Sequence, residues 1–141
     1  MRILIDTNVL IDYILRREPY TDDAEKIIFL CKNMQIEGCI AAHSVMNIFY
    51  ILRKLMTLEK RKKFLNHISE FIEIVGIDRR KIMSAVNNDQ FTDVEDCLQS
   101  ECAKEFSADY IVTRNVKDFQ NSTIPAISPD DFLKKVDLTQ F

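Results

Sequence analysis

Aspartate residues occur in this sequence at the points where an α/β protein would place its chemistry. Asp6 directly follows the apolar run 3–5, and Asp93 and Asp96 lie three residues apart ahead of another apolar run. Asp118 comes shortly after that second run. An ionised carboxylate at a buried sheet edge needs a metal ion or an arginine to offset the cost of burial. Carboxylate oxygens suit Mg²⁺ or Mn²⁺, so the pattern predicts a site for one of these ions.

The cysteines and histidines do not form a zinc-binding pattern. The chain has four cysteines with no Cys-x-x-Cys pair, and only two histidines could complete a zinc site. We expect the thiols to behave as small, buried, unpaired residues in a reducing compartment. These residues are Cys31, Cys39, Cys97 and Cys102.

The elements that must position the aspartates alternate along the chain. Short apolar runs predict strands, and stretches with helical period lie between them. This alternation is typical of βαβ units, so we expect an α/β protein with a central parallel sheet of about four to five strands. The expected strands cover residues 3–5, 39–41, 71–75, 110–113 and 124–127, and the expected helices 8–17, 24–34, 44–56, 58–70, 78–88, 93–106 and 129–135.

Local signals refine these boundaries. Gly38 is expected to end the second helix, and Ser44 to cap the third. Thr92 and Glu95 match the capping box Ser/Thr-x-x-Glu, which gives Glu95 a structural role and turns it away from the neighbouring aspartates. Asp93 alone is more typical of a partner for the helix dipole than of a metal ligand.

Length, charge and hydropathy limit the function classes. The 141 residues suit a single domain spanning residues 1–141. A net charge of −3 excludes a global positive field that attracts nucleic acid or anionic lipid, so such contacts must be local. Asp6 interrupts the first apolar run too early for a signal peptide, and the apolar runs are too short to span a membrane. We expect a cytoplasmic protein.

Four segments together resemble the successive motifs of PIN-domain proteins. They are Asp6 to Leu10, Ser44 to Tyr50, Asp93 to Asp96 and Tyr110 to Phe119, and they follow the family's order and spacing over nearly the whole chain. The first and last are the most specific. Many members of this family are VapC-type toxins of bacterial toxin–antitoxin pairs. The resemblance implies a PIN-like three-layer α/β/α sandwich around the parallel sheet.

The resemblance also implies roles for individual residues. In the family, the acidic positions bind one or two Mg²⁺ or Mn²⁺ ions and cleave RNA. Where relatives often carry Glu, this chain has Asn47, which we expect to support the site as a ligand or a capping residue. By position, Asp6, Asp96 and Asp118 match metal ligands, Asp93 is a further catalytic acid, Thr113 and Asn115 shape the site, and Arg114 and Lys117 flank it as expected RNA contacts.

Three functions follow as hypotheses. The first is a metal-dependent endoribonuclease, the toxin of a toxin–antitoxin pair, with an antitoxin partner and a homodimer that buries the apolar region 49–58. The second is a non-catalytic PIN module that binds RNA or a protein. The third, a phosphoaspartate protein, is disfavoured because Asn8 stands where a phosphatase of that type carries its second Asp.

Overall fold

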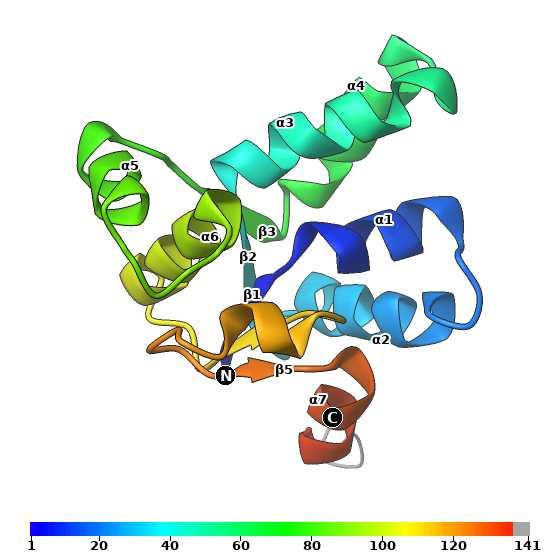
Figure 1. Cartoon of the computed structure of the whole chain (residues 1–141). Helices are drawn as coiled ribbons and strands as arrows, with labels where there is room; N and C mark the ends of the chain where they lie inside the picture. The colour runs from blue at the N-terminus through cyan, green and yellow to red at the C-terminus, as the bar shows by residue number, and fades with distance from the viewer. Residues whose placement is uncertain (137–141) are drawn as a thin grey trace.

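Five parallel strands form the central sheet of the computed structural model, which describes residues 1–136 (Figure 1). Their order across the sheet is β3-β2-β1-β4-β5, so β1 lies in the middle, with Leu4 opposite Cys39 on one side and Ile111 on the other. The number and direction of the strands confirm the prediction. The strands are β1 Arg2–Ile5, β2 Glu37–Ala41, β3 Ile72–Val75, β4 Tyr110–Val112 and β5 Ala126–Ile127.

Helices cover both faces of the sheet, which confirms the three-layer α/β/α arrangement (Figure 1). One face packs against α1, α2, α3 and α7, and the opposite face packs against α6 and η2. The helices are α1 Thr7–Leu15, α2 Thr21–Lys32, α3 Ala42–Ile51, α4 Leu58–Ile68, α5 Arg79–Val86, α6 Val94–Glu105 and α7 Pro129–Lys135, with short 3₁₀ helices η1 Leu52–Lys54 and η2 Val116–Phe119.

The strand residues divide between these two layers because successive side chains in a strand point to opposite faces. Ile3 and Ile5 enter the core shared with α1 and α2, while Leu4 enters the core shared with α6. All three are fully buried. A strand buried on both faces reads as a continuous apolar run, which is why β1 was visible in the sequence.

The prediction that Gly38 ends the second helix is wrong. Helix α2 ends at Lys32, Met34 adopts a positive φ of 58°, and Gly38 lies inside β2. A Cβ at Gly38 would lie 2.7 Å from Sγ of Cys31, closer than real Cβ contacts allow. The glycine is therefore present because α2 packs tightly on β2.

Two predicted helix caps were also wrong. Helix α3 begins at Ala42 with no side-chain cap, and Ser44 is fully buried inside it. Helix α6 is capped by Asp93, whose Oδ1 accepts hydrogen bonds from the backbone N–H groups of Glu95 and Asp96. The predicted capping box of Thr92 and Glu95 is thus replaced, because an aspartate one residue later can accept both bonds itself.

Among residues 1–136, no helix is both long enough and apolar enough to cross a membrane. The predicted single domain extends to residue 141, and its last five residues lie outside the described part of the chain.

Candidate functional site

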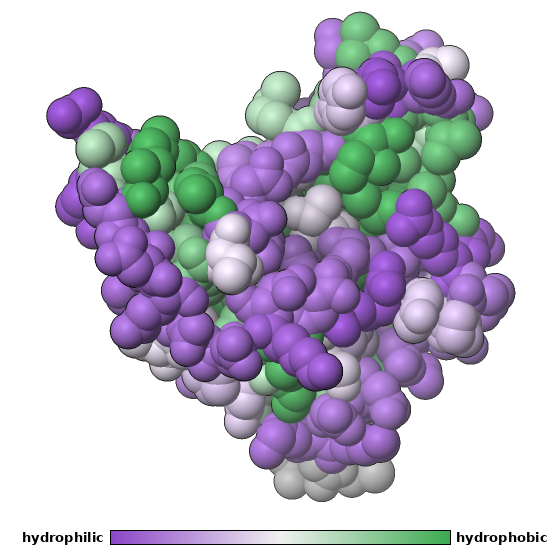
Figure 2. Space-filling model, viewed as in Figure 1, coloured by the Kyte–Doolittle hydropathy of each residue, from purple (hydrophilic) through white to green (hydrophobic). Residues whose placement is uncertain are grey.

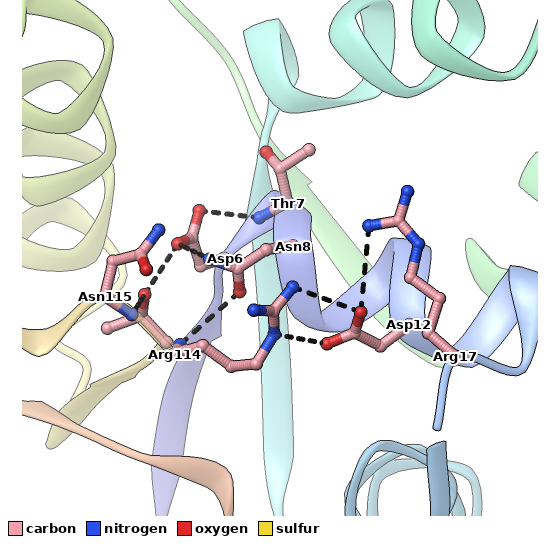
Figure 3. Close-up of polar contacts among 8 residues, drawn as sticks. Asp6, Thr7, Asn8, Asp12, Arg17, Arg114 and Asn115 are labelled. Atoms are coloured by element: carbon pink, nitrogen blue, oxygen red, sulfur yellow. Dashed lines mark hydrogen bonds and ion pairs between the residues drawn. The ribbon is translucent and has the colours of Figure 1, made fainter. Parts of the chain in front are cut away.

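Asp6 lies at the carboxyl end of the central strand and is 6% exposed. It is the residue that caps α1, so its position is fixed by the strand before it and the helix after it. Four donors reach its carboxylate. Oδ1 accepts from the Thr7 backbone N–H at 2.7 Å and from Gln99 Nε2 at 2.8 Å. Oδ2 accepts from Asn8 Nδ2 at 3.0 Å and Thr113 Oγ1 at 2.7 Å (Figure 3).

These four bonds keep the Asp6 carboxylate in one orientation. Thr113 is fully buried, and its hydroxyl also accepts from the Asn115 backbone N–H at 2.9 Å. The loop after β4 is therefore joined to Asp6 through Thr113. Gln99 was missed in the sequence, although it follows Asp96 by three residues and must share its helix face.

A cleft of about 430 Å³ opens beside Asp6 at this edge of the sheet. Of the predicted residues, Asp6, Asn47, Asp96 and Asn115 line it together. Residues not predicted for the site also line it, among them the charged Glu95 and Arg17. Figure 2 shows a hydrophilic area between the ridges formed by α5 and by α3 with α4.

Asp96 is the most strongly perturbed acid of the cleft. Burial raises its pKa from the ordinary 3.8 to about 7, and the negative charges of Asp93, Asp6, Asp118 and Glu95 add to this effect. Negative charge is thus concentrated around one half-buried carboxyl group. A divalent cation would offset that repulsion, which is the electrostatic character expected of a metal centre.

The remaining predicted residues lie around the cleft. Asp93 caps α6 and thereby fixes the backbone of Asp96. Asp118 is exposed on η2, close enough for its charge to raise the pKa of Asp96. Lys117 is exposed on the same short helix.

Arg114 is engaged by the protein itself. Its Nε and Nη2 donate to the two carboxylate oxygens of Asp12 at 2.6 and 3.3 Å (Figure 3). Its guanidinium also stacks 4.1 Å from the centre of the Tyr20 ring. Asp12 is 1% exposed, and Arg17 also lies 4.0 Å from it. The guanidinium of Arg114 therefore balances a buried charge on α1.

Asn47 and Glu95 contact each other across the cleft. Asn47 Nδ2 donates to Glu95 Oε2 at 3.1 Å, so Glu95 faces the site and is not turned away from it, contrary to the capping-box prediction. Asn47 lies in the second turn of α3, because that helix begins at Ala42.

The donor chemistry of the cleft fits Mg²⁺ or Mn²⁺, since it consists of carboxylate and amide oxygens with no thiolate. In this conformation, however, no three Asp, Glu, His or Cys side chains within residues 1–136 are grouped closely enough to hold an ion.

Comparison with solved structures identifies the same fold in bacterial toxin–antitoxin complexes. VapBC-1 of nontypeable Haemophilus influenzae superposes with a TM-score of 0.68 at 17% identity, covering 92% of this chain and 99% of that chain. A toxin–antitoxin complex of Klebsiella pneumoniae gives 0.67 at 20% identity, covering 90% and 97%. VapBC2 of Rickettsia felis, bound to a promoter DNA fragment, gives 0.65 at 18% identity, covering 91% and 98%.

At these identities the structural similarity establishes the fold alone. No curated protein sequence is significantly similar to this chain. The model of the PIN domain family matches residues 2–117, which include β1, the α6 acids and the polar loop after β4. The chain therefore belongs to the PIN domain family.

Proposed function

We propose that this protein is an endoribonuclease that hydrolyses RNA phosphodiester bonds with Mg²⁺ or Mn²⁺. The observation that carries the proposal is the pairing of a fixed, buried Asp6 with an Asp96 whose pKa is raised to about 7 in one open cleft. Such crowding of carboxylates is unfavourable unless a cation or a proton neutralises it. Membership of the PIN family supports a nuclease.

Asp6, Asp96 and Asp118 are the residues that would hold the ion. When bound, a divalent ion supplies positive charge for the phosphate and activates water for an in-line displacement. The chain itself orients these acids. Asp93 fixes the start of α6 under Asp96, while Thr113 and Gln99 hold the Asp6 carboxylate toward the cleft. A preorganised site of this kind loses little energy to reorganisation during the reaction.

RNA would reach the cleft through local cations, because the net charge of the chain is −3. Arg17 lines the cleft, and Lys117 is exposed on η2 beside Asp118. We propose these two as phosphate contacts. The predicted RNA contact of Arg114 stays a prediction, and its ion pair with Asp12 gives that side chain a structural role as well.

We also propose a protein antitoxin as partner, because solved complexes with this fold are toxin–antitoxin pairs. The ridge of α3, η1 and α4 exposes several large apolar side chains that a partner could cover (Figure 2). A small gene immediately upstream that encodes a DNA-binding protein would support this proposal, and co-expression with its product should then give a co-purifying complex. Light scattering of the isolated protein tests the predicted homodimer. The exposed residues are Met46, Tyr50, Ile51, Leu55 and Leu58.

Asp96→Asn is the best single test of the active site. No protein donor within residues 1–136 bonds to the Asp96 carboxylate, so the amide should not disturb the fold. Asp6→Asn is a weaker test, because it would place an amide nitrogen against some of the four donors now bonded to Asp6. The exposed Asp22 on α2 provides the control variant Asp22→Asn.

The purified protein with Mn²⁺ should cleave single-stranded RNA, and EDTA should abolish cleavage. Asp96→Asn should lose at least about 100-fold in rate and bind Mn²⁺ weakly by calorimetry, while Asp22→Asn should match the wild type. Cleavage that persists in both EDTA and Asp96→Asn would contradict the proposal. RNA binding without cleavage under any divalent ion would favour a non-catalytic PIN module.

A further inference from the structure

Glu95 is held over the cleft by α3, the helix on the opposite wall. Its Oε2 accepts the hydrogen bond from Asn47 Nδ2 at 3.1 Å, and its backbone carbonyl lies 3.1 Å from Nε2 of His43. Both contacts come from α3, about fifty residues earlier in the chain. An exposed glutamate at a helix start is ordinarily free to point into solvent, but here the bond from Asn47 directs the carboxylate across the site, while the His43 contact holds the backbone of Glu95.

Glu95 also retains unused acceptor capacity. Asp6 already accepts four hydrogen bonds, and Asp93 Oδ1 accepts two from the backbone of α6. Within residues 1–136, the Glu95 carboxylate accepts only the bond from Asn47. A carboxylate has about four acceptor positions, so Glu95 keeps most of them for a ligand in the cleft.

On the basis of the proposed function, we infer that the Glu95 carboxylate takes part in binding the metal ion and that Asn47 is the residue that positions it. Asn47 carries no charge, and its amide group is turned with nitrogen toward Glu95. The negative charge at the contact between α3 and α6 therefore comes from Glu95 on α6 and not from residue 47 on α3. Asn47 acts on the ion through Glu95, and Glu95 provides oxygen directly or through a bound water.

Removing the charge of Glu95 tests this inference with metal affinity as the readout. Glu95→Gln preserves the size of an exposed side chain and should fold normally, as circular dichroism will verify. The Kd for Mn²⁺ should rise about 10-fold, as measured by calorimetry or by the electron paramagnetic resonance signal of free Mn²⁺. Glu25→Gln, the same change at an exposed position on α2, should leave Kd unchanged.

A reciprocal exchange tests whether the two residues share one charge. In the double variant Asn47→Glu with Glu95→Gln, the new amide can donate to the new carboxylate, so the hydrogen bond is kept with its direction reversed. This variant should recover most of the affinity lost in Glu95→Gln. Asn47→Ala should lower the affinity for Mn²⁺ less than Glu95→Gln does. It keeps the Glu95 carboxylate and removes only the hydrogen bond that orients it.

The outcomes separate this inference from the proposed function. If Asp96→Asn loses Mn²⁺ binding while Glu95→Gln behaves like Glu25→Gln, the site stands and Glu95 is not part of it. If neither variant changes Mn²⁺ binding, the metal centre itself is misplaced. A double variant as weak as Glu95→Gln would overturn the claim that Asn47 and Glu95 share one charge position.

Discussion

At the scale of single residues, the site combines carboxylates with contrasting environments. Asp6 is buried and bonded to four donors, whereas the Asp96 carboxylate has no such donors within residues 1–136 and has a raised pKa. The protein therefore fixes the Asp6 carboxylate, whereas the Asp96 carboxylate is left for a proton or a cation in the cleft. The raised pKa of Asp96 has a measurable effect on the stability of the fold.

Asp96 should make the metal-free protein less stable as the pH rises. Its pKa is about 7 in the folded protein and near 3.8 in the unfolded chain, so between these values the folded state holds a proton that the unfolded state has released. The free energy of unfolding therefore falls from about pH 4 to about pH 7 through this group. Asp96→Asn removes the effect and should raise Tm by a few degrees at pH 8 and by much less at pH 4.

Thermal melts in EDTA, followed by circular dichroism at both pH values, would measure this difference. Asp22→Asn serves as control, since its carboxylate is exposed on α2. A Tm difference between Asp96→Asn and the wild type that is the same at pH 4 and pH 8 would contradict the assignment of the raised pKa.

The buried Asp12 should make Arg114 a stability determinant. Arg114→Gln would leave a 1% exposed carboxylate without its nearest cation, which typically lowers the free energy of unfolding by about 3–5 kcal/mol. Arg17 remains 4.0 Å away, so we expect the low end, about 3 kcal/mol. The double variant Asp12→Asn with Arg114→Gln should recover much of the loss. Urea denaturation of the three variants measures this, and a stable Arg114→Gln would contradict it.

At the scale of elements, the site depends on how helices start and on how closely they approach the sheet. The turn that opens α6 holds Asp93, Glu95 and Asp96 through one cap, and α1 begins directly after its cap, Asp6. Both helix starts lie at the carboxyl edge of the sheet, where ligands of open α/β sheets bind. Close packing beneath that edge makes this arrangement rigid.

The contact between α2 and β2 is one place where that packing leaves no room. Gly38→Ala would put Cβ 2.7 Å from Cys31 Sγ and should lower the free energy of unfolding by about 1–3 kcal/mol. Cys31→Ala removes the clashing sulfur, so the double variant should be less destabilised than the sum of the single changes. Additive effects in a double-mutant cycle of urea unfolding would show that the two residues do not clash.

At the scale of the whole molecule, all four cysteines are buried in hydrophobic clusters, as the sequence predicted: Cys31, Cys39 and Cys102 in the two cores beside the sheet and Cys97 in a smaller cluster between α5 and α6. Burial raises the pKa of Cys31 to about 12 and that of Cys102 to about 11, and it raises the pKa values of Cys39 and Cys97 as well. The thiolate is the reactive form of cysteine. A thiol reagent at pH 8 should therefore label none of the four in the native protein and all four in denaturant. Rapid native labelling would contradict this packing.

Two exposed apolar ridges flank the hydrophilic cleft on the surface of the molecule. Apolar side chains are exposed on α5 and on the ridge of α3, η1 and α4, with the hydrophilic cleft area between them (Figure 2). Exposed apolar surface of this kind commonly marks a protein interface. Any partner that covers both ridges would therefore also control access to the acidic residues.

The sequence determined the α/β class, the parallel sheet and the aspartates at its carboxyl edge, because the hydrophobic period and the alternation of strands and helices are properties of local sequence. Tertiary structure decided the partners of those aspartates. The bond from Gln99 to Asp6 spans 93 positions, that from Thr113 to Asp6 spans 107, and the Arg114–Asp12 pair spans 102. Glu95 faces the cleft, where Asn47 of α3, 48 positions earlier in the chain, donates a hydrogen bond to it. Contacts between residues so far apart in the sequence depend on how the helices pack on the sheet. The spacing of side chains along the chain does not reveal that packing.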